Sequence, residues 1–249
     1  MTIRQVDNAL RFFEYFAAGK SPATITQLAE ALGLPLSSTS NLITTLRERG
    51  YLFELRRRGG FYPTRRIFDI GTAILEGDPI LGLVREHMAE LRDKTGETIL
   101  LAARDGDDVI YLDVLESSKG VRYSACAGER RPIYAVSSGK AILSTMEDYA
   151  LAQHLLKINY ADAANTSITD PDTLLTHIIE GRRRGWFLNA TEFTPEVTGV
   201  GVLLNLGGRV LGLSVAGPNY RMNGRHEELA EALFDTLAAM RHQTAGGAE

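Results

Sequence analysis

Residues 24–50 read Thr24-Ile-Thr-Gln-Leu-Ala-Glu-Ala-Leu-Gly-Leu-Pro-Leu-Ser-Ser-Thr-Ser-Asn-Leu-Ile-Thr-Thr-Leu-Arg-Glu-Arg-Gly50, and this stretch decides the fold. Thr24 with Gln27 three residues later is a capping-box pattern, which predicts the start of a helix. Gly33 can adopt the positive φ that ends a helix, and Pro35 fits the first turn of the next helix, which does not need its N–H. The stretch therefore predicts a helix, a tight turn and a second helix.

The second predicted helix has one apolar and one polar face. Leu42, Ile43 and Leu46 supply its buried stripe. The opposite face carries short hydrogen-bonding side chains, which can reach phosphates and base edges with little entropy to lose. These side chains belong to Ser37, Ser38, Ser40, Asn41, Thr44 and Thr45.

A basic hairpin is predicted directly after the helices. The segment Tyr51-Leu-Phe-Glu-Leu-Arg-Arg-Arg-Gly-Gly-Phe-Tyr62 predicts two short strands joined by a basic tip. Helix, turn, helix and wing in this order are typical of a winged helix-turn-helix, which fits the major groove of DNA. The residues expected to contact DNA are Thr26, Ser37, Ser38, Ser40, Asn41, Thr44, Arg47, Arg56, Arg57 and Arg58. A sensor or scaffold that uses the winged helix for protein contacts is the alternative.

The charge is divided unevenly along the chain. Residues 1–70 hold ten Lys and Arg against six Asp and Glu, a net charge of +4, whereas the whole chain carries −4. A basic module on an acidic body can bind phosphates locally without the chain coating nucleic acid everywhere. The charge pattern therefore supports a DNA-binding module at the start of the chain.

Composition excludes several classes of protein. With 44% hydrophobic and 23% charged residues, the 249-residue chain is an ordinary globular protein, long enough for two cores. No apolar run is long enough to cross a bilayer, and the first residues lack the apolar core of a signal peptide. The single cysteine, Cys126, excludes an internal disulfide framework, as expected in a reducing cytoplasm. We therefore expect a cytoplasmic protein that does not contact the membrane.

The sequence lacks the patterns of known catalytic and metal sites. The five histidines have no metal-ligand spacing such as His-x-x-x-His, and no G-x-S-x-G elbow, P-loop or Rossmann fingerprint occurs. The remaining polar residues do not supply a recognisable pair of base and nucleophile. We therefore expect a protein that is not an enzyme and needs no cofactor or metal.

The predicted domain boundary follows the wing. Helical spacing runs through Ile67, Ile70 and Ile74, and Glu76-Gly-Asp-Pro79 then breaks the helix. The predicted parts are a winged helix-turn-helix over residues 1–64, a linker helix and hinge over 65–78, and a second domain over 79–249.

The second domain mixes strands and helices. Two hairpins are predicted by pairs of strands that flank turn-rich stretches, at 98–114 and at 200–216. Val121–Ala125 and Trp186–Ala190 predict two further strands. The predicted helices cover residues 80–95, 138–144, 147–156, 171–185 and 223–241. This pattern predicts an α+β fold, in which helices are segregated around an antiparallel sheet.

Several strings occur in an order that is typical of one protein family. They are Leu28-Ala-Glu-Ala-Leu-Gly-Leu-Pro35, Thr95-Gly-Glu-Thr98, Gly139-Lys-Ala-Ile-Leu143 and Leu213-Ser-Val-Ala-Gly-Pro218. With them the chain resembles the IclR family of bacterial transcriptional regulators over nearly its whole length. The resemblance implies a GAF-like effector domain that binds a small organic acid and thereby changes the affinity for DNA.

A possible anion site lies where an apolar strand turns into a helix, at Ser137-Ser138-Gly139-Lys140. The first N–H groups of a helix have no internal partner and attract anions, although an ordinary serine cap is the alternative. We expect the carboxylate of an organic acid, aromatic acids included, on the N–H groups of Ser138 and Gly139. The remaining expected contacts are the body of the ligand against Tyr134 and Val200, and a polar contact with Ser214. Lys140 is expected to point outward.

The resemblance also implies pocket residues by position. In the family, pocket residues lie on this turn, on the strand after the helix that begins at Pro171, and on the last hairpin. Carried over, they are Ser137, Ser138, Asn189, Gly199, Ser214 and Ala216.

This chain departs from the family pattern at three of these positions. Asn189 stands where an acidic residue is common, Gly199 where a cysteine is common and Ala216 where a serine is frequent. The changes predict a roomier, less polar pocket, and drift at a diverged site is the alternative. The expected aromatic walls are Tyr123, Tyr134 and Phe193.

An oligomer is also expected. One recognition helix gives little specificity, so we expect at least a homodimer, or a dimer of dimers, that reads two half-sites. Some apolar side chains of the first domain are expected to pack across a subunit interface, because so small a module cannot bury them all. These are Phe12, Phe13, Phe16, Ile67, Ile70 and Ile74.

Overall fold

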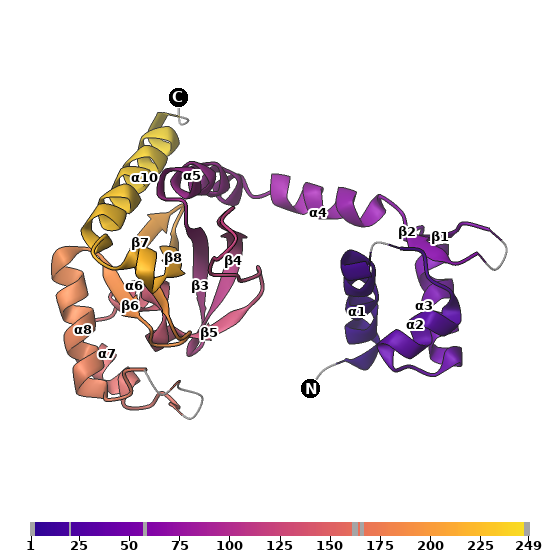
Figure 1. Cartoon of the computed structure of the whole chain (residues 1–249), viewed down its shortest axis with the longest axis horizontal. Helices are drawn as coiled ribbons and strands as arrows, with labels where there is room; N and C mark the ends of the chain where they lie inside the picture. Colours follow the sequence, from indigo (N-terminus) through magenta and orange to yellow (C-terminus); the bar gives the residue numbers. More distant parts are fainter. Residues whose placement is uncertain (1–2, 20, 57–58, 161–163, 165–166, 247–249) are drawn as a thin grey trace. The chain divides into compact units, whose positions relative to one another are not determined.

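The computed structural model describes residues 3–19, 21–56, 59–160, 164 and 167–246. The chain divides into two compact units, Met1–Pro79 and Ile80–Glu249 (Figure 1). The first unit has one hydrophobic core and the second has two, one on each face of its sheet. The α+β class expected from the sequence is confirmed.

The first unit is a winged helix-turn-helix followed by a fourth helix (Figure 1). Its elements are α1 (Arg4–Gly19), α2 (Ile25–Leu32), α3 (Leu36–Glu48), β1 (Leu52–Glu54), β2 (Phe61–Pro63) and α4 (Arg66–Glu76). The Thr24 hydroxyl accepts a hydrogen bond from the Gln27 N–H, and the Gln27 side chain accepts one from the Thr24 N–H, so the expected capping box starts α2. Gly33 ends α2 with a φ of 65°, a conformation that favours glycine.

Phe12 and Phe16 are not among the apolar side chains that remain for a partner subunit. Both rings are buried inside the first unit, where Phe12 packs 5.1 Å from Phe16, and both belong to a core that includes Leu28 and Ile43. Phe13 is half-buried. The three helices and the wing therefore bury more aromatic surface than the sequence led us to expect.

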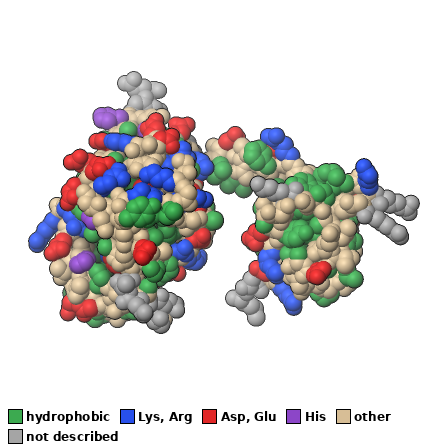
Figure 2. All heavy atoms as spheres, viewed as in Figure 1, with side chains coloured by type: hydrophobic (Ala, Val, Ile, Leu, Met, Phe, Trp, Pro, Cys, Tyr) green, Lys and Arg blue, Asp and Glu red, His purple; other side chains and the backbone are tan. Residues whose placement is uncertain are grey.

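α4 presents an uncovered apolar face, as its helical spacing predicts. The residues on it are between 36% and 69% exposed: Ile67, Phe68, Ile70, Ile74 and Leu75. Figure 2 shows hydrophobic side chains along this helix and on the body that carries α1 to α3. Exposed apolar side chains in such a row are unusual for a surface that faces only water.

The second unit is built on one six-stranded antiparallel sheet with the strand order β5-β4-β3-β8-β7-β6. The strands are β3 (Thr98–Asp105), β4 (Asp108–Leu115), β5 (Arg130–Pro132), β6 (Phe187–Ala190), β7 (Val197–Leu206) and β8 (Arg209–Pro218). β3 and β4 form the first expected hairpin, and β7 and β8 form the second.

Helices cover both faces of this sheet (Figure 1). One face packs against α5 (Pro79–Thr95) and α10 (His226–Gly246) through side chains such as Val200 and Leu213. The other face packs against the short helix η1 (Ile133–Ala135) and against α6 (Ser137–Leu143), α7 (Asp148–Leu155) and α8 (Pro171–Arg184). A further short helix, α9 (Asn219–Met222), follows β8. Because successive side chains of a strand point to opposite faces, each strand contributes to both cores.

The strand expected at Val121–Ala125 is wrong. This segment pairs with no strand among the described residues. Isolated hydrogen bonds hold it instead: the Thr98 hydroxyl donates to the Tyr123 carbonyl at 2.6 Å, and Arg221 donates to the Val121 carbonyl at 2.9 Å. The strand that pairs with β4 on the side away from β3 is β5, whose Arg131 lies opposite Val109. The segment thus lies outside the sheet, and the sheet continues from β4 to β5 instead.

Candidate functional site

The exposed face of α3 gathers most of the side chains expected to contact DNA. Thr26 on α2 is exposed, as are Ser37, Ser38, Asn41, Thr44 and Arg47 on α3, whereas Ser40 is half-buried. Thr39, Ile43 and Leu46 point into the core, so the helix presents its polar side outward. Arg56, two residues beyond β1, is exposed, and Arg57 and Arg58 lie outside the described residues.

A groove runs between α1 and α3 beside this polar face. Its lining combines the apolar side chains of Val6, Leu10 and Leu42 with Ser38 and Asn41. Val6 and Leu10 are more than half exposed. The polar face of α3 therefore borders an apolar strip on α1.

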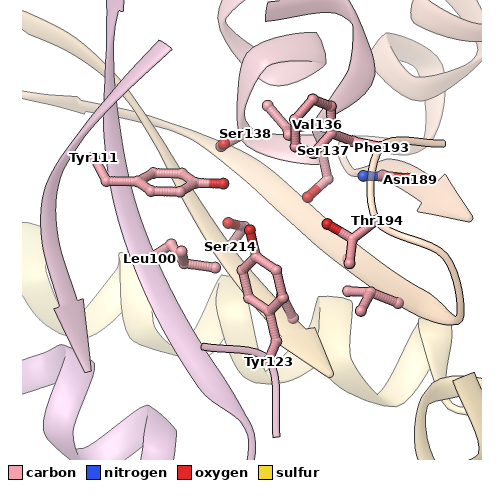
Figure 3. A pocket seen from close by; sticks show the side chains of 13 residues that line it. Leu100, Tyr111, Tyr123, Val136, Ser137, Ser138, Asn189, Phe193, Thr194 and Ser214 are labelled. Atoms are coloured by element: carbon pink, nitrogen blue, oxygen red, sulfur yellow. The ribbon is translucent and has the colours of Figure 1, made fainter. Parts of the chain in front are cut away.

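The second unit holds a pocket between the α6 side of the sheet and a loop that follows β6 (Figure 3). Its lining is Leu100, Tyr111, Tyr123, Val136, Ser137, Ser138, Asn189, Phe193, Thr194, Val197, Gly199, Ser214 and Ala216. Figure 3 shows side chains from several separate segments that converge on one small space.

Close packing of α6 on the sheet creates one wall of the pocket. A Cβ atom at Gly201 would lie 2.8 Å from the Ser137 carbonyl carbon, and one at Gly212 would lie 2.4 Å from the Ser138 carbonyl oxygen. No other residue fits at these two positions without a backbone shift. The two glycines therefore let the start of α6 lie directly on β7 and β8, with the Ser137 and Ser138 side chains at the pocket.

The pocket is small in this structure. Its volume is about 20 Å³, which is room for about one water molecule. A Cβ atom at Gly199 would approach the Ser137 hydroxyl to 3.0 Å, so the missing side chain leaves no free space. The expected roomier pocket is therefore not observed, because Tyr111, Tyr123 and Phe193 fill it.

The lining is polar but carries no charged side chain. It contains the hydroxyls of Tyr111 and Tyr123, four further hydroxyls from serine and threonine, and the Asn189 amide. Burial raises the pKa of Tyr111 far above its ordinary value, and the neighbouring Tyr123 raises it further, so the Tyr111 phenol stays neutral. The Asn189 amide donates to the Ala135 carbonyl at 2.8 Å and is thereby fixed. Such a lining offers hydrogen bonds to a small polar ligand.

Most of the residues expected to bind an effector lie in this pocket. They are Tyr123, Ser137, Ser138, Asn189, Gly199, Ser214 and Ala216, and Phe193 is the expected aromatic wall.

Three expected residues lie outside the lining. Val200 points to the opposite face of the sheet, in the core with α10, because Gly199 already faces the pocket. Tyr134 packs 4.8 Å from Tyr160 in the core beneath α6. The Gly139 backbone is pressed against η1, since a Cβ atom there would lie 2.0 Å from the Ile133 oxygen.

The sequence reasoning missed five lining residues: Leu100, Tyr111, Val136, Thr194 and Val197. Tyr111 and Leu100 lie on neighbouring strands of the first hairpin and share the sheet face of Val109. Alternation along β3 and β4 could have placed them on the α6 side. Thr194 and Val197 belong to an irregular loop and its end, for which no sequence pattern was available.

A loop over residues 191–196 closes the pocket through Phe193 and Thr194. Its ends, Thr191 and Glu196, have positive φ angles of 62° and 59°, which are unfavourable for residues other than glycine. The start of the loop is fixed because Glu192 forms a buried ion pair with Lys140. The expectation that Lys140 points outward is therefore wrong.

Neither a metal cluster nor a membrane span is found in the part of the chain that the structure describes. No group of three or more His, Cys, Asp or Glu side chains there could hold a metal ion. No helix there is long and apolar enough to cross a membrane.

Two curated proteins are similar to this chain over nearly its whole length. The HTH-type transcriptional repressor AllR of Escherichia coli is 24% identical over 234 residues, which cover 93% of this chain and 86% of AllR. The HTH-type transcriptional regulator BhcR of Paracoccus denitrificans is 27% identical over 236 residues, 94% of this chain and 84% of BhcR.

Solved structures share the fold. The IclR protein of Thermotoga maritima matches with a TM-score of 0.79 and 21% identity, over 97% of this chain and 99% of that chain. An IclR homologue from Microbacterium hydrocarbonoxydans, solved in complex with 4-hydroxybenzoate, matches with a TM-score of 0.71 and 20% identity, over 95% and 97% of the two chains.

Two family models match consecutive parts of the chain. The model of the IclR helix-turn-helix domain matches residues 5–54, and that of the bacterial transcriptional regulator IclR C-terminal domain matches residues 72–241. Since the second match alone covers more than half of the chain, this protein belongs to the IclR family of transcriptional regulators, which join a helix-turn-helix DNA-binding domain to a C-terminal ligand-binding domain and are not enzymes.

Proposed function

We propose that this protein binds promoter DNA in a sequence-specific manner and that a small organic acid in the pocket of its second unit modulates this binding. The observation that carries the DNA part is the exposed polar face of α3 beside a wing with an exposed arginine. Short polar side chains on such a helix reach base edges, and arginines hold the phosphates. Because its partner is promoter DNA, we place the protein in the cytoplasm.

On this proposal, Ser37, Ser38, Asn41 and Thr44 lie in the major groove. Thr26, Ser40, Arg47 and the wing arginines Arg56, Arg57 and Arg58 complete the contact surface. Arg47 lies with its guanidinium 5.7 Å from the Phe61 ring, which positions its charge beside the wing.

The pocket supports the effector part of the proposal. Hydroxyl and amide groups from strands and loops that are distant in the sequence line it. Most of the residues expected from the family pattern are among these lining residues. An acid is the proposed class of effector, and 4-hydroxybenzoate bound to a protein of the same fold makes an aromatic acid a reasonable first probe. Since the cavity is so small, a ligand must displace the loop at Phe193 or the tyrosines.

We also propose that the protein acts as a homodimer or a dimer of dimers. The apolar face of α4 and the exposed residues Ile3, Val6 and Leu10 of the N-terminal region offer surface for a second copy. Two copies would present two α3 helices to two half-sites, which a single helix cannot read with useful specificity.

The test uses a fluorescent fragment of the promoter upstream of the protein's own gene. Affinity is measured by anisotropy over a series of salt concentrations, with and without added acids. We expect binding that weakens as salt rises and that changes when the effector is present, because phosphate contacts release counterions. The absence of salt-dependent binding to any promoter fragment would instead favour a scaffold. A ligand with equal affinity for both states would leave DNA binding unchanged.

A further inference from the structure

Arg131 on β5 lies directly behind the rings of the pocket. Its guanidinium carbon is 5.1 Å from the Phe193 ring centroid and 6.0 Å from that of Tyr111, and both rings line the pocket. Tyr123, which also lines the pocket, interacts with the same guanidinium. Arg131 therefore lies next to three pocket residues from three different segments.

One nitrogen of this guanidinium is buried without a hydrogen-bond partner among the described residues. Nη2 donates to Glu129 at 2.5 Å and Nη1 donates to the Arg130 carbonyl at 2.8 Å, whereas Nε has no acceptor. Glu129 is one-third exposed, so its carboxylate holds the solvent side of the group. A buried charged donor without an acceptor is costly unless something supplies the acceptor.

Other sources of positive charge at the pocket are already engaged. The lining carries no charged side chain, and the Lys140 ammonium group is bonded to Glu192 and to the Leu188 carbonyl. Neither the side chains of the lining nor Lys140 therefore offers a free positive charge to a carboxylate.

We propose that Arg131 is the anion-binding residue of the pocket and donates from Nε to the carboxylate of the effector once the Phe193 ring has moved aside. This inference rests on the proposed function, because it assumes an organic acid as the effector. The ring of Phe193 covers the guanidinium in the present structure, and a ligand large enough to need more than 20 Å³ displaces that ring. A guanidinium that then meets a carboxylate forms a strong, charge-assisted hydrogen bond.

The test compares acids with their neutral amides on the full-length protein. Acetate, benzoate and 4-hydroxybenzoate, each paired with its amide, are titrated by calorimetry against the wild type and against Arg131→Met. We expect at least one acid to bind the wild type better than its amide does. Its dissociation constant should rise by at least about tenfold in Arg131→Met, because a hydrogen bond to a charged group is lost. The affinity for the amide should change by less than about threefold, and Arg131→Lys should recover part of the loss.

Arg130→Met is the matched control. Arg130 is the neighbouring residue on β5, is exposed and pairs with Asp105, so its loss removes one charge from the same strand without touching the pocket. If Arg131→Met is poorly folded, as judged by the fluorescence of the single tryptophan Trp186, then Arg131→Gln replaces it. Unchanged acid binding in folded Arg131→Met or Arg131→Gln overturns this inference alone. If none of the three acids binds the wild type, the acid effector of the proposed function fails and this inference fails with it.

Discussion

The ammonium group of Lys140 and the carboxylate of Glu192 form an ion pair that is almost completely withdrawn from water. The two side chains are 2% and 6% exposed, and they join α6 to the loop that closes the pocket. Burial lowers the pKa of Lys140, while the Glu192 charge acts in the opposite direction. The Lys140 ammonium group also donates to the Leu188 carbonyl at 3.1 Å, so it connects the loop to β6 as well.

Removing one partner of this ion pair should lower the stability of the second unit. Lys140→Met leaves the Glu192 carboxylate buried without a counterion, and we expect it to lower the free energy of unfolding by about 3–5 kcal/mol. In the double variant Lys140→Met with Glu192→Leu, much of this loss should disappear, because no buried charge remains. Unfolding in guanidinium chloride, followed by Trp186 fluorescence, measures the free energy of unfolding of both variants, since Trp186 lies in the same unit as the ion pair.

Lys94→Met is the control for the buried pair. Lys94 pairs with Asp235 at 2.9 Å on the surface, and both side chains are more than half exposed. Its loss should change the free energy of unfolding by less than about 1 kcal/mol. Equal effects of Lys140→Met and Lys94→Met would contradict the role given to the buried pair.

Glu97 should make the stability of the second unit depend on pH. Its carboxylate is fully buried and accepts from Arg221 Nε at 2.6 Å, from Arg221 Nη2 at 2.8 Å and from Lys119 at 3.2 Å. Burial acts to raise the pKa of Glu97, but the bonds from Arg221 and Lys119 prevail and lower it. A folded-state pKa below the unfolded value means that the stabilisation is present above the unfolded pKa, about 4.3, and is lost as the pH falls through the folded pKa.

Glu97→Gln should therefore be destabilised at pH 7 by about 3 kcal/mol, because Arg221 loses its buried partner. The difference from the wild type should shrink as the pH falls from about 5 toward 3. Urea unfolding of both proteins across this range measures the difference. Glu228→Gln, at the exposed pair with Arg225, should change stability little at any pH. A constant difference between wild type and Glu97→Gln at every pH would contradict the assignment.

The wing and the α3 face should contribute differently to DNA binding. Arg56→Ala should weaken binding to all sequences and make the slope of log affinity against log salt shallower by about one, because one phosphate contact is lost. Asn41→Ala should instead change base preference, by about 1–3 kcal/mol at the affected position. Anisotropy with a promoter fragment and its single-base variants separates the two effects. Arg183 is an exposed arginine on α8, and Arg183→Ala should leave the slope unchanged. If Arg56→Ala also has the slope of the wild type, Arg56 does not contact the DNA phosphates.

The sequence predicted the elements that local chemistry decides. The capping box at Thr24, the positive φ of Gly33 and the two hairpins of the second unit were all found where the pattern placed them. The prediction of a strand at Val121–Ala125 was wrong. An alternating sequence favours an extended strand, but it does not show whether an edge of the sheet is free to pair with that strand.

The pocket was partly predictable for a similar reason. Gly199 and Val200 are neighbours in β7, so strand geometry alone forbids that both face the pocket, and this rule would have removed Val200. Arg131 and Lys140 could not be placed in the same way, because their surroundings depend on a loop with two positive φ angles and on a pairing across 52 residues. The size of the pocket likewise depends on packing that no single position reveals.

The exposed face of α4 should hold two copies of the chain together. Ile74 is the most exposed residue named on that face, at 69%, and burial of an isoleucine side chain in an interface contributes about 1.5–3 kcal/mol. Ile74→Glu places a charge there instead, so we expect the dissociation constant of the dimer to rise by at least about tenfold. Light scattering over a dilution series of the full-length protein measures this change.

Leu156→Glu is the matched control, because Leu156 is an apolar residue of similar exposure, 65%, that directly follows α7 in the second unit. It should leave the dimer unchanged and should show that an added surface glutamate does not by itself dissociate the protein. Ile74→Glu should also weaken binding to a promoter fragment with two half-sites more than binding to one half-site, since only the former uses two α3 helices at once. A wild-type protein that is monomeric at micromolar concentration, or an Ile74→Glu variant that dimerises like Leu156→Glu, would show that this face serves another purpose.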